Sequence, residues 1–109
     1  MAYDEGVVQR LREFFAGRID VVEKKMFGGV AFMVCGNMCC GVVGEELMAR
    51  VGPEQYEKAV KEPYTREMDF TGKPMNGFVY VGVQGFASDE ELESWVARCE
   101  QFVSTLPPK

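Results

Sequence analysis

The sequence predicts an α+β fold, in which helices cover an antiparallel sheet of five strands. Three observations predict it. Apolar residues recur at helical spacing near both ends of the chain, apolar runs of strand length occupy the middle, and turns rich in glycine or proline separate those runs. The expected element order is α-β-β-β-α-β-β-α, and residues 1–109 are expected to form a single domain.

The first element is an amphipathic helix over Asp4 to Ala16, ended by Gly17. Its apolar stripe consists of Val7, Val8, Leu11, Phe14 and Phe15. We expect Ile19 to Lys25 to be a connection that leads into the sheet.

Three strands follow, over Val30–Cys35, Met38–Val43 and Glu46–Val51. Gly36-Asn37 suits a tight hairpin turn because glycine accepts a positive φ, and Gly44-Glu45 can close a second hairpin. Sequential hairpins predict that these three strands form a meander.

The third strand alternates between two faces. Leu47, Ala49 and Val51 are expected to share one face of the sheet, and Met48 and Arg50 the other.

The second half of the chain is predicted to contain a short helix and two further strands before the last helix. Pro53 opens a short helix that Pro63 ends. Arg66–Phe70 and Gly77–Val83 are the fourth and fifth strands, separated by the turn residues Thr71–Pro74.

The last element is a helix that begins with a capping box, Ser88 to Glu91. Its apolar residues at helical spacing are Leu92, Trp95, Val96, Cys99, Phe102, Val103 and Leu106, and Pro107 ends it.

The charge and the hydropathy of the chain exclude some classes of binding partner. The net charge is −5, and the only basic run is Lys24-Lys25, so direct nucleic-acid binding is not expected. The apolar stretch Val30–Cys35 is far too short to span a bilayer, and Asp4 and Glu5 stand where a signal peptide carries positive charge. We expect a cytoplasmic protein without a membrane segment.

No catalytic set is recognisable in the sequence. The chain has no histidine, which removes the usual general base and a common metal ligand. The four cysteines are expected to pack as small buried hydrophobic residues, and no metal or cofactor is expected. If Gly36-Asn37 is the turn, Cys35 and Cys40 lie on one face and Cys39 on the other. These residues leave open whether the protein is an enzyme, although a protein without catalytic activity is favoured.

Several short blocks, in this order and spacing, resemble the TfoX N-terminal domain family. They are Met26-Phe27-Gly28-Gly29, Ala31-Phe32, Gly36-Asn37-Met38, Leu47 to Val51, and Phe70 through Pro74-Met75 to Phe78–Val81. The resemblance implies a fold similar to that of type III secretion chaperones. Multidomain members regulate natural competence and carry a second, helical C-terminal domain. We expect the 109 residues here to form only the N-terminal type of domain.

Candidate ligand- or partner-binding residues come from the family motif and from the basic residues near the sheet. They are Lys25, Met26, Phe27, Gly28, Gly29, Arg50 and Lys73. For Gly28-Gly29 close backbone packing is favoured over phosphate binding, because no GK[ST] motif follows. For Arg50 a solvated or structural charge is favoured, and the alternative is an arginine that holds an anionic ligand in a pocket.

Both faces of Val30–Cys35 are apolar, and the sheet region is rich in methionine. If helices cover only one face, a homodimer or a bound peptide would cover the other, whereas a second helix layer is the monomeric alternative. Of these we expect the homodimer. The expected function is a regulatory or protein-interaction module, possessing no catalytic activity. The alternative is a small-molecule (anionic ligand) binding protein or enzyme that has a site near Arg50.

Overall fold

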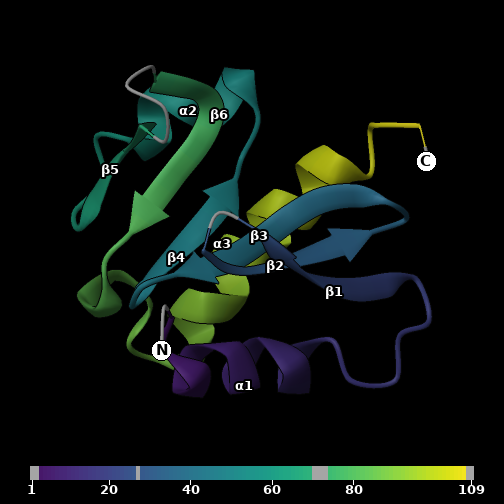
Figure 1. Ribbon diagram of the computed structural model, residues 1–109. Coiled ribbons are helices and arrows are strands. Elements are labelled where there is room, and N and C mark those ends of the chain that lie inside the picture. The colour runs from purple at the N-terminus through teal and green to yellow at the C-terminus, as the bar shows by residue number, and fades with distance from the viewer. Residues whose placement is uncertain (1–2, 27, 70–73, 108–109) are drawn as a thin grey trace.

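The computed structural model describes residues 3–26, 28–69 and 74–107, which form an open antiparallel sheet of six strands and three α-helices (Figure 1). In chain order the elements are α1 Glu5–Phe14, β1 Val21–Met26, β2 Gly29–Val34, β3 Asn37–Val43, β4 Glu46–Arg50, α2 Pro53–Ala59, β5 Thr65–Asp69, β6 Pro74–Val81, the 3-10 helix η1 Val83–Phe86, and α3 Asp89–Val103. The α+β class predicted from the sequence is confirmed.

The strand order across the sheet is β1-β2-β3-β4-β6-β5, and all neighbours are antiparallel. The predicted meander is therefore present and is one strand longer than expected, since β1 precedes it. β6 lies between β4 and β5, so the chain passes from β4 through α2 to the edge strand β5 and then returns to pair β6 with β4 (Figure 1).

The predicted count of five strands is wrong, because Ile19 to Lys25 is not a mere connection. Val21–Met26 pairs with β2 along its whole length, from Val21 opposite Val34 to Met26 opposite Gly29. The charged residues of this segment are the reason that the sequence did not predict it to be a strand. Such charges are typical of edge strands, where they discourage pairing with a further chain.

The first hairpin turn is displaced by one residue from the prediction. Val34 pairs with Asn37, so the two turn residues are Cys35 and Gly36, with φ of 51° and 83°. Two successive positive φ values are the signature of a type I′ turn, whose twist matches that of the flanking strands. A left-handed cysteine was not expected, because glycine and asparagine dominate this conformation.

The pairing of β2 with β3 is also irregular, because Met38 lies opposite Met33 while Cys40 lies opposite Phe32. Cys39 is the extra residue of this bulge. Cys39 and Cys40 are both buried in the helix-covered core, and Cys35 is exposed in the turn. The predicted distribution of these cysteines over the two faces is therefore wrong.

The later strands shift by a few residues. β5 begins at Thr65, one residue before the prediction, and Phe70 lies outside the described residues. β6 begins at Pro74 and ends at Val81, so Val83 belongs to η1 and not to the strand.

The two long helices are present as predicted, but α1 ends at Phe14 instead of Ala16, and α3 ends at Val103, before Leu106. The carboxylate of Asp4 accepts hydrogen bonds from the amides of Gly6 and Val7 at the start of α1. Ser88 and Glu91 form the predicted capping box of α3. Within the described residues, no helix combines the length and the apolar character that crossing a bilayer requires.

The main core lies between the helices and one face of the sheet. All three helices contribute to it, with Leu11 from α1, Ala59 from α2 and Val96 from α3 each fully buried. From β4 it receives Leu47 and Ala49, the face that the alternation predicted.

Candidate functional site

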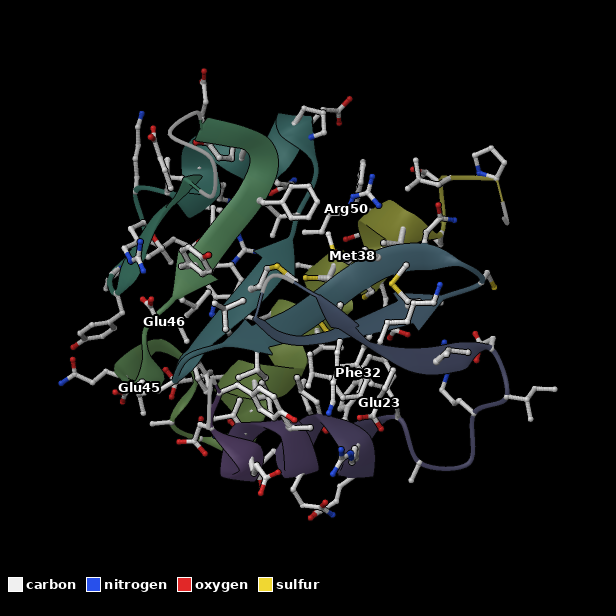
Figure 2. All side chains as sticks on the ribbon, in the orientation of Figure 1. Glu23, Phe32, Met38, Glu45, Glu46 and Arg50 are labelled. Atoms are coloured by element: carbon white, nitrogen blue, oxygen red, sulfur yellow. The ribbon has the colours of Figure 1, made fainter. Side chains whose placement is uncertain are left out.

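The other face of the sheet is lined by a second, smaller apolar cluster. We call it the open face and define it by residues from β2, β3, β4 and β6, namely Ala31, Met33, Met38, Gly41, Val43, Met48, Phe78 and Tyr80. No residue of a described helix belongs to this cluster, and Figure 2 shows Met38 at this face beside Arg50. The sheet is thus covered by helices on one side only.

A row of side chains crosses the open face from one edge strand to the other. Residues directly opposite one another in antiparallel strands point to the same face. The strand registers therefore align Lys24, Ala31, Gly41, Met48, Tyr80 and Arg66, one from each of the six strands. The row is apolar in the middle and has a cation at each end.

The centre of this row is buried and closely packed. A Cβ atom added at Gly41 would lie 2.4 Å from the carbonyl oxygen of Val30 and 2.9 Å from Cε of Met48. Glycine is therefore required there by the close approach of β2 and β4 side chains and backbone. Ala31 and Gly41 lie beside Met48, which is only 1% exposed.

A second row runs parallel to the first and is more accessible. Val22, Met33 and Met38 lie opposite one another on β1, β2 and β3. Val22 is 53% exposed, and both methionines are half-buried. Methionine is flexible and polarizable, so such a surface adapts to differently shaped partners.

Arg50 borders the open face and is held by three contacts. Its Nη1 donates a hydrogen bond of 3.2 Å to the carbonyl oxygen of Met38. Its guanidinium carbon lies 5.4 Å from the ring centroids of both Phe78 and Phe102. Among the described residues no carboxylate pairs with it, so its positive charge is positioned but not neutralised.

Arg66, at the β5 end of the row, is already paired. Its Nε donates a hydrogen bond of 3.2 Å to Glu46, its Nη2 donates a second to the same carboxylate, and its guanidinium carbon lies 4.4 Å from the ring centroid of Tyr80. The hydrogen bond and the charge of Glu46 raise the pKa of Arg66. Lys24, at the other end, is exposed and has no ion pair within the described part of the chain.

Among Lys25 to Gly29, the segment of the family motif, the described residues lie away from Arg50 and from the centre of the open face. Lys25 is exposed on β1 opposite Val30, a residue of the helix-covered core, and β2 and β3 separate its strand from that of Arg50. Met26 is the last residue of β1, while Phe27 and Lys73 lie outside the described residues. The candidate cations Lys25 and Arg50 are thus not brought together.

The glycines of the motif have a packing role. Gly28 turns the chain from β1 to β2 with φ of 75°. A Cβ atom at Gly29 would lie 1.9 Å from the carbonyl oxygen of Val42, so only glycine fits between these strands.

A cavity of about 450 Å³ lies on the helix side of the sheet, between α2 and α3. It is lined by Val51, Pro53, Glu54, Gln55, Arg98, Gln101, Phe102 and Thr105. The arginine of this lining is already paired, because Arg98 donates hydrogen bonds of 3.2 and 2.6 Å to the carboxylate of Glu62. Its guanidinium carbon also lies 4.2 Å from the ring centroid of Trp95.

Three cysteines lie together in the helix-covered core. Hydrogen bonds from the thiols of Cys40 and Cys99 lower the pKa of Cys39, while hydrogen bonding to Cys39 and burial raise the pKa of the other two. In the described ranges no three histidine, cysteine, aspartate or glutamate side chains are arranged to hold a metal ion.

Apart from Arg50 at its border, the residues that make the open face were not among the candidates. The signal for them was the apolar character of both faces of Val30–Cys35. The row that ends in Lys24 could not be found without recognising β1 as a strand.

Comparison with known proteins identifies the family of the chain but no individual relative. No curated protein and no solved structure matches the chain. Residues 13–103 match the TfoX N-terminal domain, as the sequence blocks suggested, and this match spans most of the 109 residues. The chain therefore belongs to the TfoX N-terminal domain family.

Proposed function

We propose that this chain is a regulatory protein-interaction module and that the open face is its binding surface. The observation that supports this most is the asymmetry of the sheet. Helices cover one face, and the other carries half-buried methionines and the 53% exposed Val22 on its described residues. Contiguous accessible apolar surface on a small protein is typical of a binding site.

Burial of this surface would supply the driving force. Removal of apolar surface from water contributes about 25 cal/mol per Å². The flexible side chains of Met33 and Met38 can adjust to a partner at little cost in strain. Tight backbone packing at Gly41 keeps the strands beneath them in place.

The process served is part of the proposal. Family membership supports a role in regulation, linked to transcription or competence. The cytoplasmic location stays an expectation from the sequence. No catalytic activity and no direct nucleic-acid binding are expected. The fold likeness to type III secretion chaperones and the homodimer stay predictions.

Photocrosslinking tests the proposal. A photoreactive amino acid at Val22 lies on the side of the open face, and the same amino acid at Lys25 lies three positions along β1 on the opposite side. We expect a discrete crosslinked product in cells from position 22 and none from position 25. Met38→Glu in the same chain should abolish it, because a buried carboxylate opposes docking.

Equal products from both positions, or a product that Met38→Glu leaves intact, would contradict a binding role of the open face. A product of twice the chain mass would identify a second copy as the partner.

The second candidate function is binding of a small anionic molecule by Arg50, whose charge no carboxylate of the described residues neutralises, beside the cavity between α2 and α3. Phe102 forms part of its wall and also contacts Arg50, so the cavity and the arginine adjoin through one ring. Native mass spectrometry of protein purified without added ligand tests this candidate. A stoichiometric small-molecule adduct that is lost in Arg50→Met would support it, and an unmodified mass would oppose it.

A further inference from the structure

We infer that the open face binds an acidic amphipathic helix of another protein, whose apolar side chains cover the methionines and whose carboxylates meet the available cations Lys24 and Arg50. This inference rests on the proposed function and names the chemistry of the partner.

The charges on the open face differ in sign from the charge of the chain. The chain as a whole is negative, with a net charge of −5. Along β1 to β4, and along β5 as far as Glu67, the charged side chains that the registers direct to this face are the cations Lys24, Arg50 and Arg66 and the carboxylate Glu46. Since Arg66 already pairs with Glu46, two cations are left available to a partner.

Both available cations are suited to binding a carboxylate. Lys24 is exposed and extends from the edge strand, so it can reach a partner without moving the fold. Arg50 is fixed by Met38, Phe78 and Phe102, so its fork loses little side-chain entropy on binding.

A second copy of this chain is a poorer occupant of the same face. In a two-fold dimer the same surface meets itself, so each copy would bring two available cations to the other. Like charges at an interface oppose association, whereas carboxylates of a partner complement the face and accelerate encounter.

The geometry favours a helix over an added strand. A strand would pair with a sheet edge, and β1 carries Lys24 and Lys25, which discourage such pairing. A helix instead lies on a sheet face. Adjacent strands are about 4.8 Å apart, so the row from Lys24 to Arg66 spans roughly 24 Å, which a helix of about 16 residues covers. The centre of the row is buried, so the helix would contact the half-buried Met33 and Met38 beside it.

The test uses two synthetic helical peptides of about 16 residues that share one leucine-rich face and differ on the other, which is glutamate-rich in one and lysine-rich in its counterpart. The protein is labelled with ¹³C at the methionine methyl groups, and the signals of Met33, Met38 and Met48 are assigned by Met→Leu substitution. We expect the glutamate peptide to shift these signals at micromolar concentration, with an affinity that falls as salt rises. The lysine peptide should bind at least tenfold more weakly.

Two matched variants locate the charge effect. Lys24→Glu and Lys25→Glu make the same change at neighbouring exposed positions that point to opposite faces of β1. We expect Lys24→Glu to weaken binding of the glutamate peptide on the order of fivefold, and Lys25→Glu to leave it within about twofold.

Three other outcomes of the peptide titration would contradict different steps of this inference. Equal binding of both peptides at the three methionines would overturn the acidic partner and keep the open face as a binding surface. Shifts that depend on protein concentration without peptide would identify a second copy as the occupant. Unshifted methionine signals under all these conditions would overturn both this inference and the proposed function.

Discussion

Lys24 and Lys25 are neighbours on β1 and serve opposite faces of the sheet. Lys24 lies opposite Ala31 of the open face, whereas Lys25 lies opposite Val30 of the helix-covered core. This follows from the two-residue period of a strand. Only Lys24 therefore contributes to the charge of the proposed binding surface, although Lys25 belongs to the segment that the family resemblance emphasises.

Arg50 is expected to stabilise the fold as well as to serve a partner. Arg50→Ala removes a hydrogen bond and two ring contacts, and we expect it to lower the free energy of unfolding by about 2 kcal/mol. Arg50→Lys should recover part of this, because the charge remains near the rings. Urea unfolding measures both. Unchanged stability in Arg50→Ala would show that the observed contacts contribute nothing.

Gly41 is expected to tolerate no side chain. In Gly41→Ala the new methyl group would lie 2.4 Å from the carbonyl oxygen of Val30, and we expect a loss of about 3 kcal/mol from this overpacking. Gly44→Ala is the control, since Gly44 has φ of 61° and open space around it. Its cost should be about 1 kcal/mol, from the left-handed backbone alone. Thermal unfolding compares the two, and equal losses would argue against the close packing.

The thiols are expected to react at very different rates. Cys35 is exposed, whereas Cys39, Cys40 and Cys99 are buried. Iodoacetamide on the folded protein should therefore add a single group quickly, at Cys35, and reach the others only after denaturation. Mass spectrometry with Cys35→Ser as the control counts the groups added. Rapid modification of a buried thiol would contradict the packing of α3 on β3.

The carboxyl group of Asp20 is expected to titrate below its ordinary range. A hydrogen bond from Arg18, at 2.8 Å, lowers its pKa in the folded state. A lowered folded pKa contributes stability at pH values above the unfolded pKa, and this contribution is lost as pH falls through the folded pKa. Arg18→Gln should raise the pKa of Asp20 toward its ordinary value, as carboxyl NMR titration can measure. An unaltered titration in the variant would exclude Arg18 as the cause.

The sequence predicted the parts of the fold that local patterns determine. The capping box at Ser88 and the alternation of Leu47 and Ala49 are such patterns, and both were confirmed. β1 was missed because an edge strand is half solvated, so its lysines resemble those of a loop. The bulge at Cys39 was missed because it depends on how two strands pair, which neither strand specifies alone.

The same limit applies to the candidate site. Arg50 was found because an arginine in an apolar strand is conspicuous. Its partners Phe78 and Phe102 come from β6 and α3 and meet it only through the tertiary fold. The row that joins Lys24 to Arg66 likewise needs the register of all six strands.

The yield of photocrosslinks in cells from position 22 relative to position 25 tests whether the open face is the binding surface. If the open face binds a partner, position 22 gives a discrete product that Met38→Glu abolishes, and position 25 gives no product. Equal yields from the two positions, or no product from either, would contradict a binding role of the open face.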